Sequence, residues 1–121
     1  MKSKLKLLIY FISVLFSNRP KVFWWSMIKN GSSKKENFGD ILTPYIINKI
    51  SGIKPINFDP SRGYSKYIKH SIMVGSIINK SNVNTIVWGS GIISSNQIIK
   101  GGNFLAVRGP RTYKRLQELG F

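Results

Sequence analysis

The chain has no cysteine, one histidine (His70) and only four acidic residues, Glu36, Asp40, Asp59 and Glu118. Without cysteine, neither a disulfide framework nor a thiolate metal site can form. A single histidine and four scattered carboxylates leave little material for any other metal cage, so the sequence predicts no metal and no cofactor. A histidine that stands alone beside an apolar run is more often structural than catalytic, and this is our interpretation of His70.

The scarcity of acid makes the protein strongly basic. Nineteen lysine and arginine residues give a formal net charge of +15, and such a field attracts phosphates, carboxylates, nucleic acid or anionic lipid. The lysine-, isoleucine- and asparagine-rich composition, with one alanine in 121 residues, also indicates a nucleotide-composition bias. Such a bias is an alternative, non-functional explanation for part of the lysine excess. Nucleic acid is the least supported partner, because the basic residues are dispersed and no known reader motif is present.

Residues 1–20 form an apolar and basic segment that we expect to be helical. Its apolar run, residues 5–16, is 12 residues long, whereas a membrane-spanning helix needs about 20. The sequence around Phe16 is a poor cleavage site for a signal peptide, although that interpretation stays open. Two others stand beside it: the helix packs on the domain, or it lies on an anionic membrane with Lys2, Lys4 and Lys6 near the headgroups.

Residues 21–121 predict an α/β domain with a parallel sheet. Three continuous apolar runs, residues 71–74, 85–88 and 104–107, each end at a glycine or a charged turn. Strands that are covered on both faces have this pattern, and it is typical of parallel sheets. Two further strands are predicted at residues 21–25 and within residues 53–58.

A helix is predicted over residues 40–51. Gly52 is its natural stop, and Pro44 fits only the first turn, as the residue that follows a Thr43 cap. Several apolar side chains fall largely on one face of this helix: Ile41, Leu42, Tyr45, Ile46 and Ile50.

A last helix is predicted to start at Pro110 and to end at Gly120, with apolar residues at helical spacing between them. The whole pattern predicts a Rossmann-like, open, doubly wound sheet, in which ligands bind beyond the carboxyl ends of the strands. The chain stops at Phe121, just after this helix, where the next strand of such a series should begin. We therefore expect an incomplete lobe whose sheet continues in a missing part of the protein.

The segment 108–112 is the strongest candidate for an anion site. It lies at a strand-to-helix junction, where free backbone N–H groups and the helix dipole favour an anion. Arg108 and Arg111 add guanidinium groups that bind carboxylate or phosphate in a bidentate way. The alternative is that Gly109 and Pro110 only shape the turn and the arginines are solvated.

Two short glycine and serine turns are weaker candidates for contacts with a phosphate or a sugar. Gly89, Ser90 and Gly91 follow one predicted strand, and Gly75 and Ser76 follow another. A single G-x-G is weak evidence, because many are only tight turns.

The segment Asn37-Phe38-Gly39-Asp40 precedes the first predicted helix of the domain. Asn37 or Asp40 would cap that helix, which is the favoured interpretation. Asp40 is also a candidate base for a sugar hydroxyl, with Asn37 and Gly39 beside the substrate.

The segments NFGDILTPYIINKISG, MVGSII, TIVWGSGII and AVRGPRTYKRLQELG follow one another along the chain. In this order they resemble the polysaccharide pyruvyl transferase family, particularly its succinoglycan-type bacterial members. The resemblance runs from about residue 22 to residue 120. It implies one half of a two-lobed, glycosyltransferase-B-like enzyme that is considerably longer than this chain.

The resemblance also implies an activity, the transfer of the enolpyruvyl group of phosphoenolpyruvate to two hydroxyls of a sugar, with release of phosphate. Arg108 and Arg111 match the need for cations, and Asp40 is implied to contact or deprotonate the acceptor. The family's catalytic histidine and lysine are implied to belong to the missing half, so His70 does not take that role. The implied acceptor is a sugar or a lipid-linked oligosaccharide of a cell-surface polysaccharide. The implied location is cytoplasmic, with peripheral contact at the inner membrane face left open.

Three alternatives remain open. The scaffold also suits a glycosyltransferase that uses a nucleotide-sugar. A basic, non-catalytic module that binds a membrane would share the same charge. The third alternative is that the chain is the product of an interrupted gene, and in that case we expect it to be inactive alone.

Overall fold

The computed structural model describes residues 2–121 of the chain. Its centre is a sheet of five strands in the order β2-β1-β3-β4-β5, and every neighbouring pair is parallel. The predicted α/β class with an open parallel sheet is therefore confirmed. The strands are β1 (Lys21–Phe23), β2 (Ile56–Asn57), β3 (His70–Ile72), β4 (Thr85–Trp88) and β5 (Asn103–Ala106).

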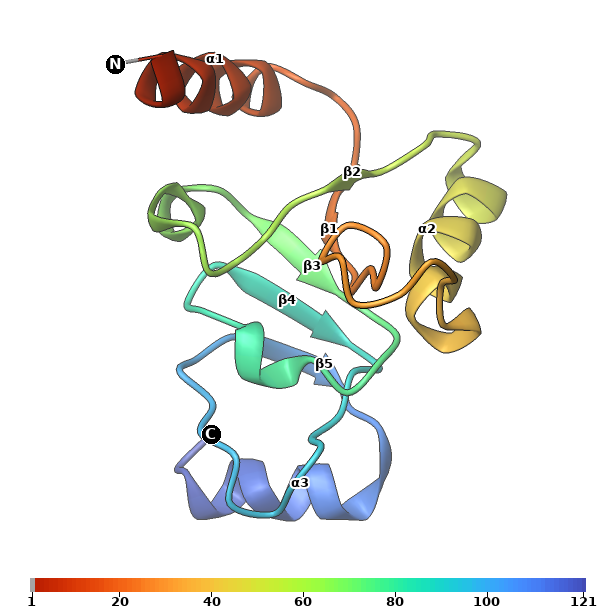
Figure 1. Cartoon of the computed structure of the whole chain (residues 1–121). Coiled ribbons are helices and arrows are strands. Elements are labelled where there is room, and N and C mark those ends of the chain that lie inside the picture. Colours follow the sequence, from red (N-terminus) through yellow and green to blue (C-terminus); the bar gives the residue numbers. More distant parts are fainter. Residues whose placement is uncertain (1) are drawn as a thin grey trace.

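In the described part of the chain, three α-helices and two short 3₁₀ helices surround this sheet. Figure 1 shows α1 at the β2 edge, α3 beside β5 at the opposite edge, and α2 on the side to which the strands point. The strand order reverses between β1 and β3, which makes the crevice beyond their carboxyl ends the usual ligand position in such sheets. The helices are α1 (Lys2–Leu15), α2 (Phe38–Ser51), η1 (Gly63–Tyr67), η2 (Ile78–Lys80) and α3 (Gly109–Glu118).

The predicted start of α2 is wrong. The helix begins at Phe38, because the side chain of Asn37 accepts the N–H of Gly39 at 2.9 Å and caps the first turn. Pro44 therefore lies inside the helix and not at its first position, at the cost of one intrahelical hydrogen bond. Thr43 is not the cap either; its buried hydroxyl accepts the N–H of Val74 at 3.1 Å and joins α2 to the end of β3. The predicted stop at Gly52 is confirmed by its left-handed φ of 70°.

The strand predicted over residues 21–25 is also shorter than expected. It ends at Phe23, so Trp24 and Trp25 lie beyond the strand, each partly exposed. Bulky aromatic residues favour strands, but here they follow the carboxyl end of β1. They therefore stand at the crevice instead of in the sheet.

One part of the core is a row of paired apolar residues on one face of the sheet. Phe23 pairs with Ile72, Ile72 with Val87, and Val87 with Phe104, so one row of apolar side chains crosses four strands. Burying each such side chain contributes roughly 1.5–3 kcal/mol. The row is covered from η2, from the loop that precedes β5 and from α3, by Ile77, Ile78, Ile99 and Leu116.

Helix α1 packs on the domain with one side only. Val14 is buried against Phe58 and Ile68, and Tyr10 and Phe11 extend the contact. The hydroxyl of Tyr10 donates to the carbonyl of Asn57 at 3.1 Å. Within residues 2–121, we find no helix with both the length and the apolar character needed to cross a membrane.

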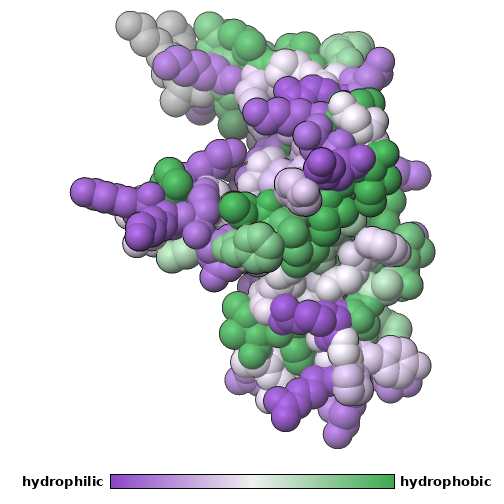
Figure 2. Space-filling view, turned by 90° about the vertical axis from the view of Figure 1, so that its right-hand side faces the viewer, coloured by the Kyte–Doolittle hydropathy of each residue, from purple (hydrophilic) through white to green (hydrophobic). Residues whose placement is uncertain are grey.

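Large apolar surfaces remain uncovered elsewhere. Tyr45 and Ile50 of α2 are 59% and 77% exposed, so most of the predicted apolar face of this helix meets solvent. Figure 2, which looks onto α2, shows a band of hydrophobic surface across the middle of this side. On the sheet face opposite Phe104, Trp88 and Leu105 are 55% and 62% exposed. Exposed apolar side chains that lie together commonly contact another part of a protein or a membrane.

Candidate functional site

The carboxyl ends of β3, β4 and β5 are tied together by their turns. The N–H of Gly91 donates to the carbonyl of Gly75 at 3.0 Å, and the N–H of Arg108 donates to the carbonyl of Ser90 at 3.0 Å. The hydroxyl of Ser90 adds a bond to the same Gly75 carbonyl at 2.9 Å. Three segments that the sequence marked as strand ends are thus one structural unit.

Arg108 crosses this unit. Its guanidinium Nη2 donates to the hydroxyl of Ser76, so a side chain from the β5–α3 junction reaches the turn after β3. The arginine passes over Gly91, where an added Cβ would lie 3.0 Å from Nε of Arg108 and 3.2 Å from Oγ1 of Thr112. The absence of a side chain at Gly91 therefore leaves room for the side chain of Arg108, and Arg108 is exposed.

The remaining turn residues act mainly on the backbone. Gly75 and Gly89 have φ values of 110° and 105°, which favour glycine. The side chain of Ser90 is fully buried and its hydroxyl points into the turn. Of these residues only Ser76, which is partly exposed, presents a hydroxyl toward a hollow.

Asp40 borders a hollow of about 430 Å³ beyond the switch between β1 and β3. A Cβ on Gly75 would lie 3.6 Å from Oδ1 of Asp40, so the carboxyl stands close to the turn that Arg108 reaches. Burial, together with the nearby charge of Glu36, raises the pKa of Asp40 above its ordinary value of 3.8. A carboxyl with a raised pKa in a hollow is a candidate acid or base. We call this space the Asp40 hollow, and it is lined by Trp25, Asp40, Ser76, Ile77, Asn79, Lys80 and Ile93.

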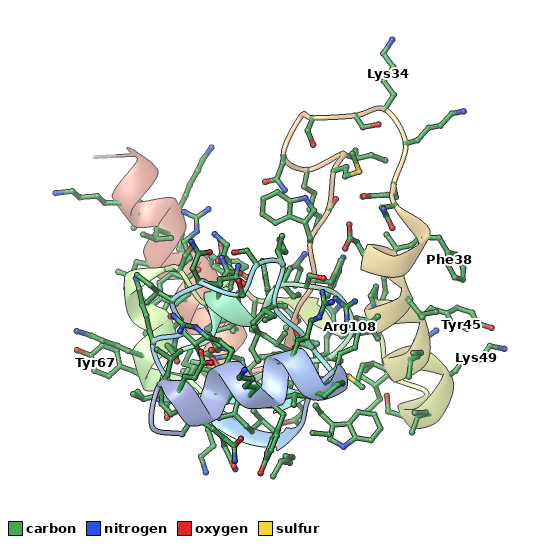
Figure 3. All side chains as sticks on the ribbon, turned by 90° about the horizontal axis from the view of Figure 1, so that it is seen from below. Lys34, Phe38, Tyr45, Lys49, Tyr67 and Arg108 are labelled. Atoms are coloured by element: carbon green, nitrogen blue, oxygen red, sulfur yellow. The ribbon has the colours of Figure 1, made fainter. Side chains whose placement is uncertain are left out.

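Asn37 and Gly39 do not enter this hollow as lining residues. Asn37 uses its side-chain oxygen to cap α2, and Gly39 supplies the N–H for that bond. Figure 3 shows Phe38, Tyr45 and Lys49 of the same helix pointing away from the body of the protein. Asp40 is therefore the member of this segment that borders the crevice.

Gly109 and Arg111 lie on the other side of Arg108, at a hollow of about 740 Å³ that also touches the first turn of α3. Arg108 is the N-terminal cap residue of this helix and makes no side-chain capping bond. Arg111 and Lys114 add positive charge to the wall, while Arg115 pairs with Glu118 at 3.2 Å. Ile93 borders both this hollow and the Asp40 hollow, so the two adjoin.

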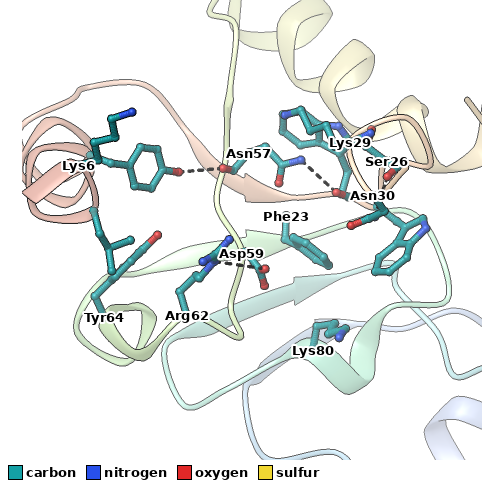
Figure 4. A pocket seen from close by; sticks show the side chains of 14 residues that line it. Lys6, Phe23, Ser26, Lys29, Asn30, Asn57, Asp59, Arg62, Tyr64 and Lys80 are labelled. Carbon is teal, nitrogen blue, oxygen red and sulfur yellow. Dashed lines mark hydrogen bonds and ion pairs between the residues drawn. The ribbon is translucent and has the colours of Figure 1, made fainter. Parts of the chain in front are cut away.

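A third hollow, of about 560 Å³, was not predicted from the sequence. It lies between α1 and the end of β1, and Figure 4 shows Lys6 on one side and Lys29 and Lys80 on the other. Lys80 and Trp25 also border the Asp40 hollow, so these two spaces adjoin. We call it the α1 hollow; its charged and aromatic lining residues are Lys6, Tyr10, Phe23, Trp24, Trp25, Lys29, Asp59, Arg62, Tyr64 and Lys80.

His70 lies at the amino end of β3, away from all these hollows. Its Nδ1 is 2.8 Å from the carbonyl of Ile68, and its Nε2 is 2.7 Å from Oγ1 of Thr85. A carbonyl only accepts, so Nδ1 carries the proton and Nε2 accepts from the threonine. Burial lowers the pKa of His70 below its ordinary 6.5. Across residues 2–121, no three histidine, cysteine or acidic residues gather as a metal site.

No protein-family model, curated protein or solved structure matches the chain significantly. The fold defines it as a protein with a parallel α/β sheet. Any activity has to be argued from the residues around the crevice.

Proposed function

We propose that the crevice beyond the strand ends binds phosphoenolpyruvate and that the protein transfers its enolpyruvyl group to a sugar of a cell-surface polysaccharide. The observation that carries this proposal is the approach of Arg108 to Ser76 beside the hollow of Asp40. A cation for an anionic donor and a carboxyl of raised pKa thus border two adjoining hollows at the usual ligand position of such a sheet. The resemblance of the motifs to pyruvyl transferases selects the donor.

In this proposal the arginines bind the donor. Arg108 pairs with the carboxylate or the phosphate of phosphoenolpyruvate, and Arg111 supports the second anionic group from the first turn of α3. Free N–H groups at that helix end add to the positive potential. No metal or cofactor is required for these contacts.

Asp40 is proposed to act on the acceptor. The terminal enol carbon of phosphoenolpyruvate takes up a proton, and a first sugar hydroxyl attacks the resulting cationic carbon. Phosphate then leaves with the electron pair of its C–O bond, and the second hydroxyl adds to the new cation and closes the ketal. Of the two hydroxyl protons, one balances the proton taken up by the enol carbon and the other leaves with the phosphate. Asp40 receives the proton of an attacking hydroxyl, and the raised pKa of its carboxyl makes it a better proton acceptor than an ordinary aspartate.

We further propose that this α/β unit works with a second lobe, as in a glycosyltransferase-B-like enzyme. The exposed Trp88 and Leu105 on the sheet, with the exposed apolar side chains of α2, support this arrangement. An apolar face of this kind is normally covered in the working protein.

The test is ligand binding by the full 121-residue chain, measured by thermal shift. We expect phosphoenolpyruvate to raise the unfolding temperature and uridine diphosphate to leave it unchanged. Arg108→Ala should weaken phosphoenolpyruvate binding at least tenfold, or about 1.4 kcal/mol. Lys34→Ala is the control, because Lys34 lies at the tip of an exposed loop (Figure 3). Stabilisation by the nucleotide alone would replace the proposal with a nucleotide-sugar glycosyltransferase, and stabilisation by neither would leave a binding module or an inactive fragment.

A further inference from the structure

The outer side of α1 is apolar and exposed. Positions 5, 8, 9, 12, 15 and 16 recur at the spacing of one helix face, and their side chains are between 45% and 81% exposed. The inner side is already used, because Val14 is buried against Phe58. The outward residues are Leu5, Leu8, Ile9, Ile12 and Leu15 of α1, together with Phe16 directly after it.

Positive charge surrounds this apolar face. The first 21 residues contain five basic and no acidic side chains, and those of Lys4 and Lys6 are exposed. Lys6 also borders the α1 hollow, which brings Lys29, Arg62 and Lys80 to the same side of the molecule. The carboxylate of Asp59 is the single acidic group in this lining, and it pairs with Arg62 at 3.8 Å.

We propose that α1 lies flat in the headgroup region of an anionic bilayer and that the α1 hollow receives the phosphate of an anionic lipid headgroup. The outward residues of α1 then enter the acyl boundary, as in other interfacial helices. The 14-residue helix is about 21 Å long, too short to span the bilayer core of about 30 Å. This proposal stands on α1 and its hollow and does not depend on the transfer reaction.

Charge complementarity decides the occupant. Two copies of this chain that paired through α1 would place four exposed lysines, Lys4 and Lys6 of each copy, along the interface without any acid in either helix to balance them. Anionic headgroups neutralise the same lysines, and each basic side chain near such a surface adds to the attraction. The aromatic rings of Tyr10 and Tyr64 at the hollow suit the interface, where amphipathic rings gather.

The experiment is flotation of the full chain with two kinds of vesicle, pure phosphatidylcholine and phosphatidylcholine with a third of phosphatidylglycerol. We expect at least tenfold stronger partitioning to the anionic vesicles. Ile9→Asp removes apolar contact, and Lys80→Glu reverses a charge inside the hollow; each should weaken partitioning at least fivefold. The matched controls are Ile50→Asp, an exposed isoleucine of α2, and Lys114→Glu, an exposed lysine of α3 at the far edge of the sheet. Both should stay within twofold of the unchanged protein.

Each other outcome has a definite meaning. Equal partitioning to both vesicles, or controls as weak as the test variants, overturns the proposal. A dimer in size-exclusion chromatography that Ile9→Asp dissociates, without vesicle binding, makes a second copy the occupant. Millimolar inorganic pyrophosphate that protects the protein from unfolding, while vesicles do not bind, makes the hollow a site for a free phosphate compound instead. Circular dichroism confirms that each variant is folded.

Discussion

The two ends of the sheet use polar residues in different ways. At the amino ends, His70, Thr85 and Asn82 satisfy one another: Oγ1 of Thr85 contacts Nε2 of His70 at 2.7 Å and accepts the N–H of Asn82 at 2.8 Å. At the carboxyl ends, backbone bonds between turns form the frame, and the charged groups of Asp40 and Arg108 stand at the borders of hollows. At the amino ends the polar groups bond to one another and stabilise the fold, whereas at the carboxyl ends two charged groups border hollows that are open to solvent.

This difference concerns burial as much as bonding. His70 and Thr85 are 2% and 1% exposed, so an unpaired atom there has no access to water. Arg108 is exposed and bonds to a partly exposed serine. Substitutions at the two ends should therefore separate effects on folding from effects on binding.

The largest effect is expected from Thr85→Val. Valine keeps the shape but leaves Nε2 of His70 and the N–H of Asn82 without their partner, and each such buried group costs about 1–3 kcal/mol. We expect a loss of about 2–4 kcal/mol in the free energy of unfolding, measured by urea denaturation and circular dichroism. Ser76→Ala at the carboxyl end should stay within about 0.5 kcal/mol. Equal losses in the two variants would contradict the comparison.

Gly91→Ala should have the next largest effect. Its Cβ would lie 3.0 Å from Nε of Arg108 and 3.2 Å from Oγ1 of Thr112. The arginine can shift, but Thr112 is buried and bonded to the carbonyl of Arg108, so we expect a cost of about 1–3 kcal/mol. Phosphoenolpyruvate binding should weaken along with stability in the same titrations. A variant with normal stability and normal binding would show that the arginine does not need this path.

A smaller effect, on the pH dependence of folding stability, is expected at the amino ends of the strands. Burial depresses the pKa of His70 in the folded state below its ordinary 6.5, so the unfolded chain takes up more protons just below pH 6.5. The contribution of neutral His70 to stability is therefore fully present above this pH and is lost as pH falls from about 6.5 toward 5. Urea midpoints measured across this range should fall for the unchanged protein and change less for His70→Asn. An unchanged slope in the variant would assign the effect to other groups.

The smallest effect, with the opposite sign, is expected at the carboxyl end. Because the folded-state pKa of Asp40 is raised above its ordinary 3.8, its contribution to stability is present at low pH and is lost as pH rises through the raised value. Asp40→Asn should therefore slightly increase the urea midpoint at pH 7, and this gain should shrink toward pH 4. Candidate active-site groups often reduce stability in this way. A lower midpoint at pH 7 would indicate that Asp40 mainly stabilises the start of α2.

The sequence predicted the strands most accurately where the local residue pattern and the final structure agree. Residues 85–88 form β4 as expected, and β3 and β5 lie within two residues of their predicted places. Continuous apolar runs that end in glycine explain this, because Gly75 and Gly89 have backbone angles that end a strand. The helix after Arg108 begins one residue before Pro110, as its fixed φ allows.

Other features depend on contacts that no local pattern contains. Asn37 and Asp40 are both good capping residues, and only the bond from Gly39 selects the former, which moves Pro44 into the helix. The candidate site shows the same limit. The convergence of Arg108 on Ser76 joins residues 32 positions apart, and the α1 hollow combines side chains from position 6 to position 80. The number of lysine and aromatic residues in the sequence does not indicate which of them meet in one hollow.

The position of the tryptophans gives the protein three intrinsic optical reporters. Trp24 and Trp25 line the α1 hollow, and Trp25 also lines the Asp40 hollow. Trp88 stands on the uncovered face of β4, 55% exposed to solvent. A ligand in the crevice should change the emission of the first pair, whereas a lobe that covers the sheet should shift the emission of Trp88 to shorter wavelength. Single-tryptophan variants would thus show separately when the crevice is filled and when the sheet is covered.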